Sequence, residues 1–327
     1  MPFQSELQLA IDAVRKASAL CKRVQENLID SDTVQKNDKS PVTIADLGTQ
    51  AVVNIAIRQQ FPDAAMIGEE DSKVLRENPG LSAKVVELVR EIHPGIEEEA
   101  VFSAIDFGSA QDTGGRFWTL DPIDGTKGFL RGDQYAIALA LVEEGQVVMG
   151  VLGCPNYPLE PDNPLNKGAL FYAVKGEGAC ELPLGGGAER KITTDGQADP
   201  AQARFCESVE AAHASHDTHA RIGEMVGISA PPYRIDSQCK YAAVARGDAS
   251  IYLRLPRNLV YREKIWDHAA GVIVVAEAGG RISDFSGNPL NFGRGSRLED
   301  NVGILVSNGP LHGKTLEAIE QVVDLGE

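Results

Sequence analysis

The apolar residues of this chain change their spacing twice along its length. In the first part they recur every three or four residues, which is the period of an amphipathic helix. We expect one helix whose buried face carries Leu7, Ile11, Val14, Ser18, Cys21 and Leu28. Ser40-Pro41-Val42-Thr43 is expected to separate it from a second helix through Ala51 and Ile55, and Leu81 to Ile92 shows the same period.

The centre of the sequence instead contains continuous apolar runs bounded by turn residues, which indicates strands. Tyr135 to Val142 and Val147 to Leu152 predict a hairpin around Glu143-Glu144-Gly145-Gln146. Phe117 to Leu120 predicts a strand that stops at Asp121-Pro122, because proline cannot continue a central ladder.

Further turns follow, and then strands and helices alternate. Lys175-Gly176-Glu177-Gly178 is predicted to join two strands, whereas Pro155 to Asn166 and Gly185 to Ala188 are predicted surface loops. The alternating segments are Arg204 to Val209, His216 to Val226, Tyr241 to Ala245, Ile251 to Leu255, Trp266 to Ala276, Arg281 to Asp284, Val302 to Val306 and Leu311 to Val323. Antiparallel strands followed by such alternation predict layered sheets and helices.

The chain is acidic, with 31 basic and 47 acidic residues and a formal net charge of −16. Such a surface repels polyanions, so we expect neither a nucleic-acid partner nor an acidic membrane. No apolar run reaches the roughly 18 residues of a membrane span, and no secretory signal pattern is visible, so a cytoplasmic protein is expected. The cysteines are widely spaced without a C-x-x-C pair, which predicts buried free thiols at Cys21, Cys154, Cys180, Cys206 and Cys239.

The most informative string is Asp121-Pro122-Ile123-Asp124-Gly125-Thr126, between a predicted strand and a short helical turn. Its two carboxylates can converge on one point, and such oxygen ligands suit Mg²⁺. Gly125 lets the backbone approach a ligand closely. A bare D-x-x-D is more often an Asp-rich turn with an Asp N-cap, but the full six-residue string favours the ligand interpretation.

Three further acidic positions are each ambiguous alone. Glu69 lies in an acidic turn that comes after the short apolar stretch Ala64 to Ile67. Alone, such a turn is more often solvated than a metal ligand. Asp267 opens the predicted helix at Trp266, where a carboxylate complements the helix dipole. Asp46 fits a capping box with Thr43.

Together these strings resemble the inositol monophosphatase superfamily of lithium-sensitive, Mg²⁺-dependent phosphatases, which carries GEE-type, DPIDGT-type and WDHAAG-type signatures. The 3′(2′),5′-bisphosphate nucleotidase branch is more similar still. The strings that carry this resemblance are Lys127 to Tyr135, Asp38 to Thr43, Asp236 to Tyr241 and Tyr252 to Pro256. The resemblance implies an α+β fold, a layered αβαβα sandwich with an N-terminal antiparallel-sheet lobe over residues 1–180 and a C-terminal α/β lobe over residues 181–327.

The resemblance also implies roles for individual residues. Two or three Mg²⁺ ions would be held by Glu69, Asp121, Asp124, Asp267 and the carbonyl of Ile123. Asp46 and Thr126 would position and deprotonate water for a metal-activated in-line attack, without a phosphoenzyme. The substrate would contact Gly125, Thr126, His213, Ser237, Lys240 and Arg254.

Structural alternatives remain for three of these substrate residues. Lys240 could be a solvated helix residue, Arg254 could pair with an acidic neighbour, and His213 lies in a His-rich surface segment.

The implied reaction converts adenosine 3′,5′-bisphosphate to AMP and phosphate, with 3′-phosphoadenosine 5′-phosphosulfate as a further substrate, and the implied role is in sulfur metabolism. We expect a lithium-sensitive monomer. The nearest alternative is an inositol polyphosphate 1-phosphatase or another sugar phosphatase of the same superfamily. A non-catalytic nucleotide sensor is a third hypothesis, disfavoured because a pure binder has no use for the water-activating pair Asp46 and Thr126.

Overall fold

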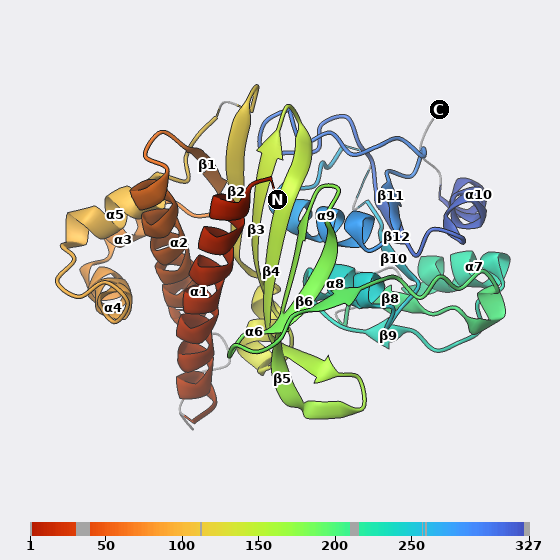
Figure 1. The fold of residues 1–327 in the computed structure, drawn as a ribbon, viewed down its shortest axis with the longest axis horizontal. Coiled ribbons are helices and arrows are strands. Elements are labelled where there is room, and N and C mark those ends of the chain that lie inside the picture. The colour runs from red at the N-terminus through yellow and green to blue at the C-terminus, as the bar shows by residue number, and fades with distance from the viewer. Residues whose placement is uncertain are drawn as a thin grey trace.

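The computed structural model describes residues 2–30, 40–111, 113–209, 216–256, 258 and 260–323. Within these residues, layers of helix and sheet alternate: two helices, a large sheet, two helices, a smaller sheet and two outer helices (Figure 1). This arrangement confirms the expected layered αβαβα sandwich.

The first half of the chain builds the outer helical layer and the large sheet. The helices are α1 (Gln4–Asp30), α2 (Ser40–Gln60), α3 (Lys73–Glu77), α4 (Pro79–Arg90), α5 (Glu98–Asp106) and α6 (Thr126–Arg131). The strands, in spatial as well as chain order, are β1 (Ala65–Gly68), β2 (Arg116–Asp124), β3 (Ala136–Glu143), β4 (Gln146–Glu160), β5 (Asn163–Val174), β6 (Gly178–Pro183) and β7 (Arg190–Ile192). Only the β1–β2 pair of this sheet is parallel.

The second half builds the middle helices, the smaller sheet and the last layer. Its helices are η1 (Pro200–Gln202), α7 (His216–Val226), α8 (Cys239–Arg246), α9 (Ala269–Glu277) and α10 (His312–Val322). Its strands are β8 (Phe205–Glu207), β9 (Tyr233–Arg234), β10 (Ile251–Arg254), β11 (Arg281–Ser283) and β12 (Ile304–Ser307), in the spatial order β11-β12-β10-β8-β9.

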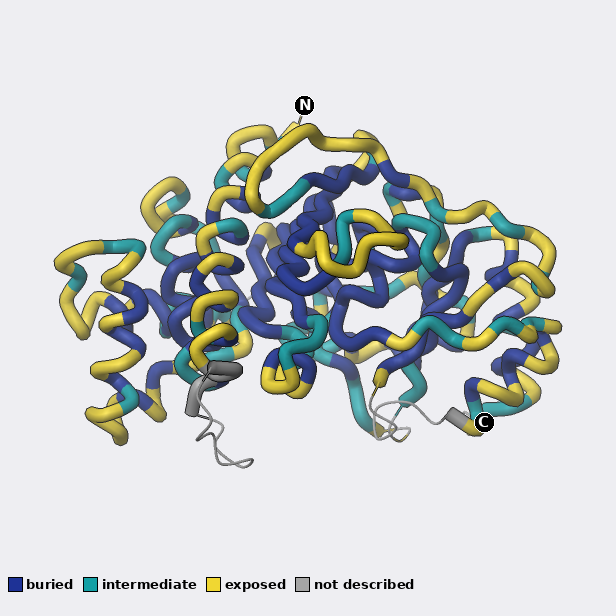
Figure 2. Tube along the Cα trace, turned by 90° about the horizontal axis from the view of Figure 1, so that it is seen from below, coloured by how far each residue is buried: buried dark blue, intermediate teal, exposed yellow. Residues whose placement is uncertain are grey.

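Apolar side chains fill the space between successive layers. One buried cluster joins α1 and α2 to the large sheet, a second joins that sheet to α8, α9 and the smaller sheet, and a third lies under α7 and α10. Figure 2 shows buried segments running through the middle of the molecule, while the peripheral turns are exposed. The middle cluster explains why α9 is apolar on nearly all sides: it is covered by a sheet on each face.

The structure corrects two predicted strand ends. Strand β2 does not stop at Asp121 but runs through Pro122 to Asp124, because its pairing with β3 shifts between Asp121 and Asp124. A proline is tolerated at such an irregularity, where the ladder needs no N–H from it. Residues 155–166 are not a loop either, since β4 and β5 extend into this region as a projecting hairpin (Figure 1).

Two predicted helix starts also differ. Helix α2 already begins at Ser40, so Thr43 and Asp46 lie inside it and form no capping box. Helix α9 begins at Ala269, so Asp267 lies in the preceding turn and not on the helix.

The two sheets divide the chain between Ile192 and Phe205, and the boundary expected at 180/181 falls within β6. Because both sheets pack on the shared α8–α9 layer, the two-lobe division stays a prediction. The cysteine prediction is confirmed, since all five thiols are free and buried. Among the described helices, none combines the length and the apolar character needed to cross a membrane.

Candidate active site

A cavity of about 440 Å³ opens where β2 ends and α6, α8 and α9 begin. It brings together most of the site residues predicted from sequence: Glu69, Asp121, Ile123, Asp124, Gly125, Thr126, Ser237, Lys240, Arg254 and Asp267. Asp46 is buried in α2 and is not part of the cavity wall. His213 lies outside the described residues.

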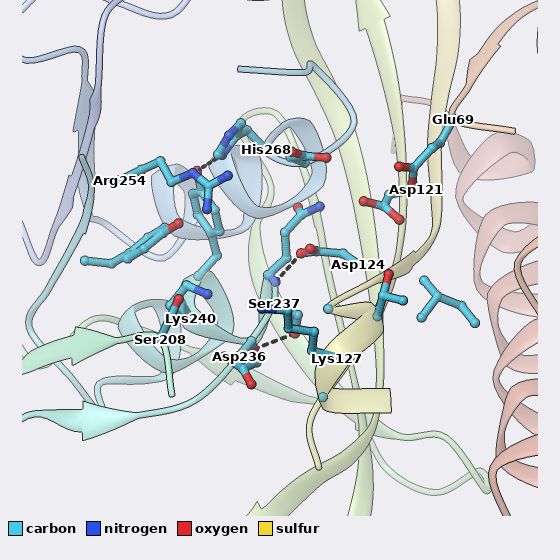
Figure 3. A pocket seen from close by; sticks show the side chains of 18 of the residues that line it. Glu69, Asp121, Asp124, Lys127, Ser208, Asp236, Ser237, Lys240, Arg254 and His268 are labelled. Carbon is cyan, nitrogen blue, oxygen red and sulfur yellow. Dashed lines mark hydrogen bonds between the residues drawn. The ribbon is translucent and has the colours of Figure 1, made fainter. Parts of the chain in front are cut away.

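The register of the parallel β1–β2 pair places the first acidic residues side by side. Gly68 is opposite Leu120, so Glu69, just past the end of β1, and Asp121, the next residue of β2, come to the same edge of the sheet. The shifted register after Asp121 then carries the chain to Asp124 at the strand end. Figure 3 shows Glu69 and Asp121 together on one side of the cavity, with Asp124 reaching into its middle.

The turn after Asp124 requires glycine. Gly125 has a φ of 90°, in the left-handed region, and a Cβ at this position would lie 2.8 Å from the Cβ of Ser237. Ser237 is itself in a left-handed conformation, with a φ of 66°. Two adjacent left-handed residues from distant segments therefore let the α6 turn and the start of α8 approach closely.

The clustered carboxyl groups are poorly solvated. Burial, more than any other influence, raises the pKa of Glu69, Asp121 and Asp124, and the charges of Glu69 and Asp124 raise that of Asp121 further. The pKa of Asp267 reaches about 8, through burial and then the charges of Asp124 and Glu69. Asp46 belongs to the same electrostatic group, because burial and then the charges of Glu70 and Glu69 raise its pKa.

This cluster could hold a metal ion. Oδ1 of Asp121 is buried without a hydrogen-bond partner, in a wall shared with Glu69, Asp124 and Asp267. Two like charges 4 Å apart repel by about 4 kcal/mol at an effective dielectric of 20, so bound divalent cations would both satisfy that oxygen and relieve the repulsion. Oxygen ligands of this kind suit hard cations.

A second acidic grouping overlaps the first. Glu263, Asp267 and His268 each offer a ligand atom, and these atoms lie within 4.8 Å of one another. However, both oxygens of Glu263 accept hydrogen bonds of 3.1 Å from Arg254. A cation at this place would compete with the guanidinium. Among the described residues this is the only group of three such ligand atoms within 4.8 Å, so the carboxylates of Glu69, Asp121, Asp124 and Asp267 line one wall without being drawn together around a single point.

The opposite side of the cavity carries positive charge (Figure 3). Lys240 is only 4% exposed, and none of the described acidic groups lies within 4.0 Å of its Nζ. The alternative that Lys240 is a solvated helix residue is therefore wrong. The alternative that Arg254 pairs with an acidic neighbour is confirmed, since Arg254 forms a two-bond ion pair with Glu263. Arg254 also lines the cavity.

Several wall residues were missed by the sequence reasoning: Lys127, Ser208, Asp236, Gln238, Tyr241, Tyr252 and His268. All but Ser208 lie inside or next to the strings that carried the family resemblance, so those strings could have indicated them. Ser208 follows β8 with no such string around it, and only the parallel pairing of β8 with β10 brings it to the cavity.

Comparison with known proteins identifies the family. Residues 4–324 match the inositol monophosphatase family. The chain belongs to this family. Similar relatives include proteins named 3′(2′),5′-bisphosphate nucleotidase from Oryza sativa, 46% identical over 98% of this chain and 95% of the relative, and from Schizosaccharomyces pombe, 43% identical over 98% and 97%. A Candida albicans protein named 3′(2′),5′-bisphosphate nucleotidase 2 is 42% identical over 98% of each chain.

Solved structures of inositol monophosphatases share the fold of this family member. The Thermotoga maritima enzyme superimposes with a TM-score of 0.65 at 24% identity, and the Anabaena enzyme with 0.64 at 22% identity, each over 98% of both chains. These matches confirm the fold class expected from sequence.

Proposed function

We propose that this chain is a phosphomonoesterase that hydrolyses the 3′-phosphate of adenosine 3′,5′-bisphosphate to AMP and phosphate. The observation that carries the proposal is the division of one cavity into an acidic side and a basic side. A substrate with two separate phosphates uses both sides, one phosphate at the cation-binding carboxylates and the other at Lys240 and Arg254. The names of the relatives that are 41–46% identical support the same substrate class.

The cation ligands in this proposal are the side chains of Glu69, Asp121, Asp124 and Asp267 and the carbonyl of Ile123. Bound divalent cations would neutralise these carboxylates and polarise the phosphate undergoing hydrolysis. We propose Mg²⁺, two or three ions per site, because the donors are hard oxygens.

The chain's own residues would direct the attack of water. Asp46, with its raised pKa, would accept the proton of the attacking water through the hydroxyl of Thr126. As the water oxygen bonds to phosphorus, the bond from phosphorus to the 3′-oxygen breaks in line, and the leaving oxygen takes a proton from solvent. Gly125 presents no side chain to the phosphate, so the phosphate can approach the backbone.

The remaining phosphate would be held by charge. Lys240 and Arg254 would neutralise the 5′-phosphate, and Ser237 would bond the sugar. We place His213, which lies outside the described residues, in the same substrate site on the family resemblance alone. A monomeric state, a cytoplasmic location, lithium sensitivity and a role in sulfur metabolism belong to the same proposal.

A substrate panel tests this function. We expect phosphate release from adenosine 3′,5′-bisphosphate and from 3′-phosphoadenosine 5′-phosphosulfate that requires Mg²⁺ and falls when Li⁺ is added. Changing Asp121→Asn should lower this activity at least about a hundredfold, because one cation ligand is lost. Faster release from inositol 1,4-bisphosphate would instead identify an inositol polyphosphate phosphatase, and tight nucleotide binding without phosphate release would identify a sensor.

A further inference from the structure

Two of the proposed cation ligands, Glu69 and Asp267, lie just outside regular elements, where the backbone is not held by a helix or a strand ladder. Glu69 follows the last residue of β1, and Asp267 lies in the turn before α9. Where these carboxyl groups are ionised and no cation is bound, their mutual repulsion acts to separate the turns. Other contacts must therefore hold the turns at the cavity.

Gln238 makes such contacts on the α9 side. Its backbone N–H donates to the carboxylate of Asp124. Its side-chain Nε2 donates to the carbonyl of Trp266 at 2.8 Å, and its Oε1 accepts from the N–H of Gly271 at 3.0 Å. This one residue, which is 1% exposed, thereby joins the segment of Asp124 to both sides of the Asp267 turn.

The side chain of Gln238 also accepts a hydrogen bond from the first turn of α9. The N-cap residue of α9, His268, makes no side-chain capping bond, and Gly271 is in the first turn, where N–H groups have no partner within the helix. The amide of Gln238, the N-cap residue of α8, provides that partner. The start of α9, and with it the preceding Asp267, is thus anchored to α8.

Gln50 makes equivalent contacts on the β1 side. From α2, its Oε1 accepts from the N–H of Glu70 at 3.0 Å, and its Nε2 donates to the carbonyl of Glu70 at 2.6 Å and of Ile105 at 3.0 Å. Gln50 therefore binds both the backbone N–H and the backbone carbonyl of Glu70, the residue next to Glu69.

The surroundings of Gln50 are shaped to admit its amide. A Cβ on Gly68 would lie 2.6 Å from Oε1 of Gln50, and a Cβ on Gly108 would lie 2.9 Å from Nε2. Any larger residue at these two positions would displace the amide, so the fold contains a fitted place for it.

We propose that Gln50 and Gln238 are positioning residues that hold the acid-bearing turns at the cavity wall before any cation binds. The inference rests on the proposed function, because it takes the carboxylate wall as the cation site. In contrast to a general contribution to stability, this role predicts a specific loss of cation affinity.

The test compares Gln50→Met and Gln238→Met with a matched control, Asn301→Leu. Methionine keeps the volume of glutamine and removes the amide. Asn301 is also buried and, like Gln50, makes three side-chain hydrogen bonds, to Asp284, Pro289 and Asn291, but it is not part of the cavity wall. Binding of Mg²⁺ and of Mn²⁺ to the metal-free, full-length proteins is measured by isothermal titration calorimetry, together with the thermal unfolding midpoint.

We expect each glutamine variant to bind the ions about 10- to 100-fold more weakly than wild type, as is typical for loss of groups that orient metal ligands. The Asn301→Leu variant should lose stability yet bind within about twofold of wild type. The kcat of the glutamine variants should recover toward wild type as Mg²⁺ is raised, since the ligands themselves are intact. If Gln238→Met does not fold, Gln238→Asn, which is one methylene too short to reach both Trp266 and Gly271, is used in its place.

Two results would overturn the inference and leave the proposed function standing: unchanged cation affinity in the glutamine variants, or an equal loss in the Asn301→Leu control. A wild-type protein that binds neither ion would instead overturn the cation site, the proposed function and this inference together.

Discussion

Lys240 and Arg254 face the same cavity, but their charges are compensated differently. The charge of Arg254 is matched by Glu263: burial alone would raise the pKa of this acid, but His268 and Arg254 together hold it at about 2. Lys240 has no described acidic group in ion-pair contact, and its Nζ lies 5.2 Å from the ring centre of Tyr252. Burial lowers its pKa, while the charge of Asp124 acts in the opposite direction. An anion in the cavity therefore gains more from Lys240 than from Arg254.

Changing Lys240→Met should weaken binding of adenosine 3′,5′-bisphosphate by roughly 10- to 100-fold, the size of one buried charge-assisted contact. Turnover of a minimal phosphate monoester without a second phosphate should change little. The check is KM and kcat for both substrates, with Lys175→Met as a control, because Lys175 is exposed and outside the cavity wall. Equal losses on the two substrates would refute the role of Lys240.

At the scale of single elements, α10 is attached to the smaller sheet through a buried histidine. Sequence periodicity predicted the helix over Leu311 to Val323 but not its attachment. His312, at the first turn of α10, lies 2.8 Å from Oγ of Ser307 on β12 and 3.0 Å from Oγ of Ser283 on β11. Burial, with a smaller contribution from the charge of Arg281, lowers the pKa of His312 to about 4.

This depressed pKa predicts a pH-dependent stability. His312 is neutral in the folded state, whereas in the unfolded chain a histidine takes up a proton near pH 6.5. The unfolded state therefore binds more protons as pH falls from about 6.5 to 4, and the free energy of unfolding decreases over that range. Urea unfolding at several pH values should show a shallower decrease for His312→Gln than for wild type, because glutamine still bonds both serines but does not titrate. If the free energy of unfolding depended on pH in the same way in both proteins, His312 would not be the group that causes the decrease.

At the scale of the whole molecule, the large sheet and the middle helices are joined by a buried ionic network around Arg246 of α8. Its guanidinium, with the side chain 4% exposed, contacts Glu181 of β6 at 2.9 Å and the carbonyl of Pro158 of β4 at 2.7 Å. It also lies 4.5 Å from the ring centre of Tyr157 and pairs with Asp248. The network fixes α8, and so Lys240, relative to the sheet that carries the acidic wall.

Removing this arginine should destabilise the whole fold. Arg246→Met leaves the carboxylate of Glu181, which is 2% exposed, without its buried partner, and we expect a loss of about 3 kcal/mol in the free energy of unfolding. Arg190→Met removes the other partner of Glu181, but this arginine is 56% exposed and should cost about 1 kcal/mol or less. Urea denaturation of both variants measures the difference, and similar losses would show that burial of Arg246 is not what matters.

The sequence by itself determined much of this protein. Apolar spacing predicted the layered helices and sheets, since a helix or a strand must bury its apolar face whatever its neighbours are. Short motifs such as Asp121 to Thr126 carry the resemblance to the family, and that resemblance named most of the expected cavity residues by number. The hairpin at Glu144-Gly145 also followed from local preference, and both residues adopt the positive φ that such a turn needs.

Only the tertiary structure decided which partners these residues meet. The passage of β2 through Pro122 depends on its register with β3. The ion pair of Arg254 depends on the position of Glu263 in the folded chain. The side-chain amides of Gln50 and Gln238 bond to segments 20 to 55 residues away. The physical reason is the range of the interactions. Backbone preferences and apolar periodicity act between neighbours in sequence, whereas charge pairing and buried hydrogen bonds are set by segments that only folding brings together.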